Sequence, residues 1–584
     1  MPQVLIPVFA SLLPAVGPIS LAPGIGFGVA TGTFAVASIT AYAVTTAATL
    51  GLSLLLTPNK PKGDPQQIAV KQSLPARTRS YGRVKVAGAY AFIQTSLGSL
   101  YQVVVHGEGE WDAIEQWWLN DKNANLSSNI VSIVPWAGLV RIYSHLGSPS
   151  QAADSGLVAA FPSWTSDHRL RGLAYSILWL PAVPEDKFSA TYPNGVPALR
   201  VVARTSKVYD PRNGATAFSE NPALCIRDYL IHSRGFAISS SMIDDASFAA
   251  FANVCDQPVS LAAGGTEPRY RVAMTYDMVT EPREVLQQLL QSCDAEIYPT
   301  PDGKVAIRGG KWDEPTVTVG AESILAFQYV QGNDRLAAFN RLKLTYTNRD
   351  ADYQPVEIDP WEDLTSQAQV GVLQQDLTLT QVPSWTQARR LGKIFAHKNN
   401  PRHRLELQVG PAAINALGER IVQVVLPELE IDEPFFVEKF EIQGDFSGGS
   451  MTLASLSSAA YAWTTAEEGS APSAPPSPAP SAPPPTPTGL SLSVESRRIA
   501  SGIFAIRVRG TVDPLIDTPW TTIGRYRKSG DTTWIDMTSD VAWQIVTDAV
   551  EDDETYEVQA AHAGYGGKNS GQVSAWTASQ FVST

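Results

Sequence analysis

Apolar and polar residues alternate along much of the early part of the chain, from Gln67 to Val105 and again further on. An alternation with a period of two places successive side chains on opposite faces of a sheet, so it predicts β-strands. The predicted strands of this part are Arg83–Val86, Tyr101–Val105, Leu173–Leu180 and Ala198–Val202. Residues 120–170 are rich in Ser, Asn and Gly and are expected to be insertions or long loops.

Four later segments are predicted helices, and short strands are expected to dominate between residues 295 and 460. The helices are Pro222–Phe236, Asp244–Val254, Thr280–Cys293 and Ser384–Asn399. Asp244 or Asp245 is a suitable N-cap for the second helix. In the third helix Thr280 is the expected N-cap and Pro282 falls in the first turn, where its missing N–H costs nothing.

The C-terminal part of the chain consists of a proline-rich segment followed by a segment with strand-like runs. Nine of the nineteen residues from Ser470 to Thr488 are proline, which no helix or sheet interior tolerates, so residues 466–488 are expected to form an extended linker. The nineteen residues from Ser470 to Thr488 alone span about 60 Å at ~3.1 Å per residue. Residues 489–584 are predicted to be a small β-sandwich, because strand-like runs alternate with Asp, Gly and Pro turns. The runs are Ile503–Val508, Ile523–Arg527, Thr533–Met537 and Tyr556–Ala560.

Residues 1–59 contain no Asp, Glu, Lys, Arg or His. Within them Ala35–Leu56 is almost wholly apolar and about long enough to cross a bilayer as a helix. Gly24, Gly28 and Gly32 stand four residues apart, which on a helix gives a smooth face for close packing. Three interpretations stay open: burial in an assembly, which we favour; a membrane span; and a secretory signal, which the missing positive charge and the length disfavour.

Composition narrows the class of protein. A chain of 584 residues exceeds what one hydrophobic core holds, so several domains are expected. Charged residues make up only 17% and the net charge is −13, which argues against a nucleic-acid-binding site, because such a site needs a basic patch. Cys225, Cys255 and Cys293 lack the spacing of a metal site or a disulfide framework and are expected to be buried.

No catalytic or metal-binding constellation stands out, so we expect the protein not to be an enzyme and to need no cofactor. The seven histidines are scattered, without the spacing of a metal site. His397 and His403 are expected to serve a basic helix end and the loop after it. Asp552 and Asp553 are expected in a turn rather than across a catalytic cleft.

Several motifs follow one another in the middle of the chain. They are Val208–Gly214, Ser219–Leu230, Ile243–Phe248, Ala252–Asp256, Glu281–Leu286, Asp302–Val305, Asn340–Tyr346 and Asp352–Pro355. With these motifs in this order, residues 70–460 resemble the tail tip attachment protein J family of long-tailed phages. Near the C-terminus, Pro487–Leu490, Tyr526–Asp531 and Tyr556–Ala560 resemble a fibronectin type III domain, with Tyr556 at the position of that family's tyrosine corner.

The resemblance implies a tail tip hub in which three chains, each with two tube-like β-barrel domains, form a pseudo-sixfold ring that matches the hexameric tail tube. The expected fold is mainly β with some α. The expected divisions are the charge-free segment 1–59, a first hub β-domain with loop insertions at 60–210, a peripheral α+β region at 211–320, a second hub β-domain region at 321–465, the linker 466–488 and the fibronectin-like sandwich 489–584.

The expected location is the distal end of a phage tail in the virion, with a role in host attachment and genome delivery. The expected partners are two further copies of the chain, the distal tail protein or tail tube ring, the tape-measure protein, and tail fibres or receptor-binding proteins. Residues 1–59 are expected to pack on the axis through Gly24, Gly28 and Gly32 or to contact the host membrane. Two alternatives remain: a membrane-anchored surface adhesin, and a hub with a cryptic cell-wall hydrolase activity.

Overall fold

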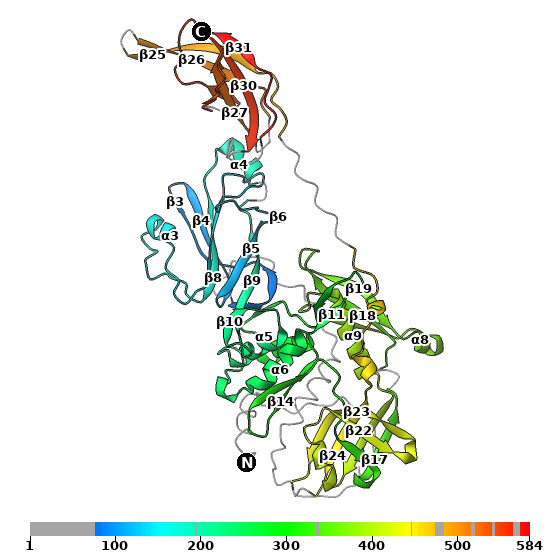
Figure 1. The fold of residues 1–584 in the computed structure, drawn as a ribbon. Coiled ribbons are helices and arrows are strands. Elements are labelled where there is room, and N and C mark those ends of the chain that lie inside the picture. Colours follow the sequence, from blue (N-terminus) through cyan, green and yellow to red (C-terminus); the bar gives the residue numbers. More distant parts are fainter. Residues whose placement is uncertain are drawn as a thin grey trace. The chain divides into compact units, whose positions relative to one another are not determined.

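The computed structural model describes residues 76–192, 195–333, 338–444, 447–473, 484–500, 503–515, 520–539, 543–564 and 573–584 (Figure 1). The chain divides into two compact units: unit 1 contains Lys207–Pro475, and unit 2 contains Asp64–Ser206 and Pro476–Thr584. The fold is mainly β with some α, as the sequence predicts. The charge-free segment 1–59, with Gly24, Gly28 and Gly32, lies outside the described residues.

Residues 76–206 of unit 2 form two sheets around one core. The first sheet has the order β1–β4–β8–β7, with β3 also pairing with β4. The second has the order β9–β5–β6, with β2 also pairing with β9. These strands are β1 (Thr78–Tyr81), β2 (Arg83–Val86), β3 (Ala89–Ser96), β4 (Ser99–Glu108), β5 (Trp111–Leu119), β6 (Lys122–Asn123), β7 (Arg141–Leu146), β8 (Leu173–Leu180) and β9 (Leu199–Asp210). Val104, Leu119, Leu178 and Leu199, one from each of four strands, are fully buried between the sheets.

The expectation of loops at residues 120–170 is wrong in part. The segment contains β6, β7 and the helix α3 (Ser155–Ala160). Val131, Trp136 and Val140 belong to the core between the sheets. Ser is the commonest residue of the segment, but a few large apolar side chains suffice to fix it, because each buries a large area.

Unit 1 begins with an α+β region of three helices and short hairpins. The helices are α5 (Pro222–Ile231), α6 (Asp245–Cys255) and α7 (Pro282–Gln291), and α4 (Glu185–Thr191) belongs to unit 2. The strands are β10 (Ala215–Phe218), β11 (Pro258–Ser260), β12 (Thr266–Pro268), β13 (Met274–Asp277), β14 (Ala295–Pro299) and β15 (Val305–Gly309). Helices α5 and α6 pack side by side near β14 and β15 (Figure 1).

All four predicted helices are present, with one wrong cap. Helix α7 begins at Pro282, so Glu281 and not Thr280 occupies the N-cap position, and its side chain makes no capping bond. Proline at the first helical position sets this boundary, because its fixed φ suits that position. Asp244 occupies the N-cap position of α6, also without a side-chain capping bond.

The rest of unit 1 is a second β region. A six-stranded sheet has the order β16–β22–β23–β24–β21–β17, and every strand contributes to one apolar core around Phe435, Leu405 and Leu453. Its strands are β16 (Thr318–Gly320), β17 (Ile324–Gln331), β21 (His403–Val409), β22 (Ile421–Leu426), β23 (Ile431–Ile442) and β24 (Gly449–Ser455). The turn η3 (Ala321–Ser323) joins β16 directly to β17, so the two ends of the sheet follow one another in sequence.

A three-stranded sheet and the helix α9 (Trp385–Asn399) complete unit 1. The sheet has the order β19–β18–β20, formed by β18 (Arg341–Asn348), β19 (Gln354–Glu362) and β20 (Gln374–Leu379). Helix α9 packs on β18 so closely that a Cβ atom at Gly392 would lie 2.8 Å from the Leu344 side chain. The short helix α8 (Leu364–Val370) projects from this sheet (Figure 1).

The C-terminal region is a sandwich of two sheets, as predicted. One sheet has the order β25–β26–β29 and the other β28–β27–β30–β31. Their strands are β25 (Ser491–Ala500), β26 (Ile503–Thr511), β27 (Trp520–Lys528), β28 (Ile535–Met537), β29 (Gln544–Val546), β30 (Thr555–Gly564) and β31 (Gln580–Ser583). Val508 and Ile545 from the first sheet pack with Tyr526 and Val558 from the second.

Candidate functional site

The motif Val208–Gly214 forms the tight connection between β9 and β10. The Asp210 carboxylate accepts hydrogen bonds from the Arg212 backbone N–H at 2.9 Å and from its guanidinium at 2.8–3.1 Å. Arg212 also donates to Asp256 at 2.7 Å. The hydrogen bond from Arg212 lowers the pKa of Asp210 from its ordinary value. These charges fix a turn against the end of α6, which is a structural use of the motif.

The following motifs lock α5 and α6 together. Asn221 caps α5 by accepting from the Ala223 N–H at 3.0 Å, and its amide donates to the Ala252 carbonyl in α6 at 2.9 Å. Arg227 holds both carboxylate oxygens of Asp245 at 2.7 and 3.1 Å. A bidentate ion pair of this kind fixes the relative orientation of the two side chains as well as their distance. The motif residues that carry the family resemblance therefore serve caps and helix contacts here.

Helix α9 connects the α+β region to the second β region. Its N-cap Ser384 accepts from the Gln387 N–H, and the Ser384 hydroxyl donates to Glu267 of β12 at 2.8 Å. Arg390 reaches the same Glu267 at 2.9 Å. The fully buried Gln387 amide bridges the backbone of Arg271 and Ser292 with bonds of 2.8–2.9 Å.

A cluster of buried charges lies beside α9. The Asp294 carboxylate accepts from Lys398 at 2.7 Å, from the Tyr461 hydroxyl at 2.8 Å and from Arg420 at 3.2 Å. The Arg420 guanidinium, whose side chain is 3% exposed, also reaches Glu296 at 3.1 Å. Burial, with the negative Asp294 beside it, raises the pKa of Tyr461. Asp294 directly precedes β14, Arg420 directly precedes β22, Lys398 lies in α9 and Tyr461 follows β24, so the cluster links these elements.

A second buried polar network crosses the first β region. The ring of His106 lies between the Ala87 carbonyl, 2.8 Å from Nδ1, and the Ser176 hydroxyl, 2.9 Å from Nε2. A carbonyl only accepts, so Nδ1 carries the proton and Ser176 donates to Nε2. The chain continues through Ser144, 2.8 Å from Ser176, to the Trp117 indole N–H at 2.9 Å. Burial lowers the pKa of His106 to about 4, so the ring is neutral.

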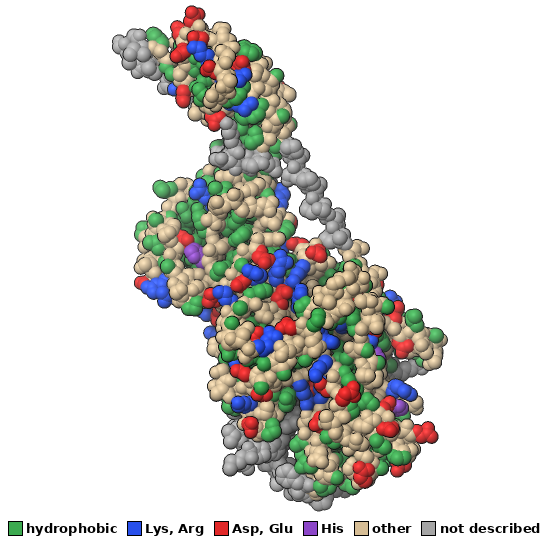
Figure 2. Space-filling view, viewed as in Figure 1, with side chains coloured by type: hydrophobic (Ala, Val, Ile, Leu, Met, Phe, Trp, Pro, Cys, Tyr) green, Lys and Arg blue, Asp and Glu red, His purple; other side chains and the backbone are tan. Residues whose placement is uncertain are grey.

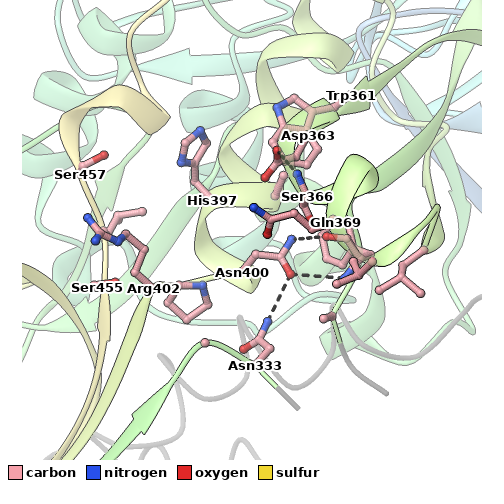
Figure 3. Close-up of a pocket in the computed structure, with 18 of the residues that line it drawn as sticks. Asn333, Trp361, Asp363, Ser366, Gln369, His397, Asn400, Arg402, Ser455 and Ser457 are labelled. Atoms are coloured by element: carbon pink, nitrogen blue, oxygen red, sulfur yellow. Dashed lines mark hydrogen bonds between the residues drawn. The ribbon is translucent and has the colours of Figure 1, made fainter. Parts of the chain in front are cut away.

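A hollow lies between the C-terminal end of α9, α8 and the strands β23 and β24 (Figure 3). Its volume is about 920 Å³. Asn400 accepts from Asn333 at 3.2 Å and donates to the Phe339 carbonyl at 2.9 Å, and Asp363 caps α8 by accepting from Ser366 at 3.0 Å. These polar groups are committed to the backbone around the hollow, and among the lining residues we find no hydrogen-bonded nucleophile and base.

His397 points into this hollow from the last turn of α9 (Figure 3). Its place beside Lys398 in that turn confirms the predicted basic helix end. Burial, together with the charge of Lys393, lowers the pKa of His397. The ring stands edge-on to Trp361, with the centroids 6.2 Å apart. The hollow itself was not predicted, because its walls come from segments far apart in sequence.

The cysteines and the acidic pair that the sequence analysis singled out lie where they were expected. Cys225, Cys255 and Cys293 are buried, as expected. Asp552 and Asp553 lie in a turn, as predicted.

Within the described ranges, His, Cys, Asp and Glu form no group of three that could hold a metal ion. On the face drawn in Figure 2, acidic and basic side chains are intermingled and form no broad basic patch. No helix in the described part of the chain is both long and apolar enough to span a bilayer.

Tyr556, which was predicted to occupy a tyrosine-corner position, makes a specific contact in the C-terminal sandwich. The Tyr556 hydroxyl accepts a hydrogen bond from the Glu551 backbone N–H at 3.0 Å, five residues upstream. A bond of this kind is typical of immunoglobulin-like sandwiches. On one sheet the Arg525 guanidinium lies between two indoles, 4.5 Å from the Trp534 ring centre and 4.2 Å from that of Trp576.

Comparison with known proteins gives a fold relationship. No family model and no curated protein matches the sequence. A chain of the virion of a native gene transfer agent particle matches with a TM-score of 0.53 and 16% identity, over 72% of this chain and 93% of that chain. This chain therefore shares its fold with a virion component.

Two prophage proteins match more weakly. The 43 kDa tail protein of prophage MuSo2 from Shewanella oneidensis gives a TM-score of 0.26 at 11% identity, over 66% of this chain and 98% of that chain. The prophage tail protein gp18 from Listeria monocytogenes EGD-e gives 0.22 at 9% identity, over 68% and 92%. TM-scores this low do not establish a shared fold with either protein.

Proposed function

We propose that this chain is a structural, non-catalytic protein of a phage-type tail tip. Three copies form a hub that closes the distal end of the tail tube and carries fibres or receptor-binding proteins. The observation that supports this most strongly is the fold shared with a chain of the gene transfer agent virion over 72% of the sequence. The ordered motifs between residues 208 and 355, which resemble the tail tip attachment protein J family, support it independently.

The placement of charge supports an architectural role. The motif residues Asp210, Asn221 and Arg227 hold turns and helices, and Asp294 holds the buried cluster beside α9. Buried ionic contacts require exact geometry and tolerate little movement of the elements that they join. A rigid body of this kind suits a hub that must match a symmetric tube.

The proposal assigns a role to each part of the chain. Residues 60–210 and 321–465 are the two hub β-domains, 211–320 is the peripheral region, and residues 1–59 occupy the axis, against other copies or the tape-measure protein, or contact the host membrane. The linker 466–488 carries the sandwich 489–584 outward. The Tyr556 corner supports a fibronectin type III-like identity for this sandwich.

Fractionation of purified particles tests the proposal. An antibody against residues 489–584 is expected to label one end of the tail, and quantitative mass spectrometry is expected to find three copies per particle. Recovery of the chain in host membranes, with none in particles, would contradict the hub and favour the adhesin. Zymography of the purified chain on cell wall is expected to show no clearing, and a cleared band would contradict the non-catalytic role.

A further inference from the structure

The strand β17 is an edge strand without the charged residues and prolines that protect many edges against pairing. It pairs with β21 on one side, and no strand of the described chain pairs with its other side. Its eight residues, Ile324–Gln331, include no charged residue, no proline and no glycine. Leu325, Phe327 and Val330 are 71%, 40% and 54% exposed. An exposed, uncharged, apolar edge is a template for another strand.

The strand β3 in unit 2 has the same character. It pairs with β4 alone among the described strands, and its eight residues Ala89–Ser96 also lack charge, proline and glycine. Ile93 is 44% exposed, and Leu97 at the hairpin tip is fully exposed. Leu97 has a φ of +47°, a left-handed conformation that disfavours leucine. An apolar side chain held there in solvent adds nothing that the fold itself needs.

Other long edge strands of this chain are protected. The edge strand β19 contains Pro355, Glu357, Asp359, Pro360 and Glu362. The edge strand β25 contains Glu495 and Arg498. Charges and prolines on edges are the usual means by which soluble proteins prevent strand addition. Among the described edge strands of eight or more residues, β19 and β25 carry these groups and β3 and β17 do not, which indicates that the two open edges meet a partner.

We infer that β17 of one copy pairs with β3 of the next copy of this chain. Both strands have eight residues, about 27 Å at ~3.4 Å per residue, so their edges match in length. A contact between two different edges runs head to tail, uses both edges of every copy and, in a trimer, closes into a ring. This inference rests on the proposed trimeric hub and names the surface through which its copies meet.

Two complementary variants of the full chain test the pairing. Leu325→Glu with Val330→Glu charges β17, and Glu at 330 lies opposite Arg404 of β21, so the sheet itself tolerates it. Ile93→Glu with Leu97→Asn charges β3, and Asn suits the left-handed position at the tip. The matched control, Val494→Glu with Phe504→Glu, charges exposed positions of the protected β25–β26 hairpin.

Sedimentation velocity is expected to show self-association of wild type and control, and at least a tenfold weaker association for each edge variant alone. A one-to-one mixture of the two edge variants retains one intact β17 and one intact β3, so it is expected to form a heterodimer. Recovery in the mixture also shows that both variants fold. Edge variants that associate like wild type, a mixture that stays monomeric, or a monomeric wild type would overturn the inference.

The hub proposal is tested separately by incorporation into particles. If edge variants enter tails as trimers like wild type, the pairing of β3 with β17 is wrong and the hub stands. If the wild-type chain is absent from particles, the hub itself is wrong, whatever the strands do in solution.

Discussion

Asp294 offers the sharpest perturbation of the buried charge cluster. Its carboxylate accepts hydrogen bonds from Lys398, Tyr461 and Arg420 at 2.7, 2.8 and 3.2 Å. The side chains of Lys398 and Arg420 are only 8% and 3% exposed. Asp294→Asn keeps the volume of the side chain and removes its charge, so the effect reports on electrostatics rather than packing.

Arg420 and Lys398 are affected differently by the substitution Asp294→Asn. Arg420 retains its ion pairs with Glu296 at 3.1 Å and Asp313 at 3.4 Å. Lys398 forms its one described ion pair with Asp294, so the substitution removes it. Removing one partner of a buried pair costs about 3–5 kcal/mol, because the other charge stays buried. Asp294 is 15% exposed, so water offsets part of the cost and we expect about 3 kcal/mol. For a unit of this size that lowers the melting temperature by roughly 6–12 °C.

Differential scanning calorimetry of the full chain measures this change. The control Asp432→Asn removes an exposed carboxylate bonded to Gln423 and is expected to cost less than about 0.5 kcal/mol. The double variant Asp294→Asn with Lys398→Met leaves no unpaired lysine and is expected to regain part of the loss. An Asp294→Asn transition at the wild-type temperature, or a double variant less stable than the single one, would refute the reasoning.

Three further predictions concern other parts of the chain. Folding lowers the pKa of His106 from 6.5 to about 4, so its stabilisation is complete above pH 6.5, and about 3 kcal/mol is lost as the pH falls to 4, as urea unfolding at several pH values will show. Arg525→Ala removes the guanidinium between Trp534 and Trp576 and is expected to destabilise the sandwich by about 1–2 kcal/mol, measured by tryptophan fluorescence. Asn340→Ala removes the acceptor 2.7 Å from the Leu373 N–H and is expected to speed hydrogen exchange of residues 363–373.

Two of these predictions have a control variant, and the third has an outcome that would contradict it. His106→Gln has no imidazole to titrate and is expected to lose less stability than wild type between pH 6.5 and 4; equal slopes would contradict the network. Lys528→Ala removes a lysine of the same strand that pairs with the exposed Glu551 and Glu554, leaves Arg525 against both rings, and is expected to cost less than Arg525→Ala. Unchanged exchange in Asn340→Ala would show that α8 does not depend on that amide.

The local features of the fold were predictable because neighbouring residues determine them. Alternation located β2, β4 and β8, and caps and prolines located the four helices. The N-cap of α7 was wrong by one residue, because Pro282 takes the first helical position and Thr280 lies outside. The strands within 120–170 were missed because their composition resembles loops although Val131 and Trp136 are core residues.

The long-range features were beyond the sequence. Lys398 and Tyr461 lie 104 and 167 residues after Asp294 in the chain, so no local sequence pattern predicts their contact. The hollow beside His397 is likewise lined by residues from segments that lie far apart in the sequence. The open edges of β3 and β17 leave a readable signal, eight uncharged residues each, but only the sheet order shows that these strands are edges.

A density map of the tail tip of purified particles tests the central claim most directly. The account predicts three copies of the chain in a closed ring beneath the last tube layer, with the sandwich 489–584 projecting outward from the linker. A tail tip whose density contains no copy of this fold, or a copy number other than three around the axis, would contradict it.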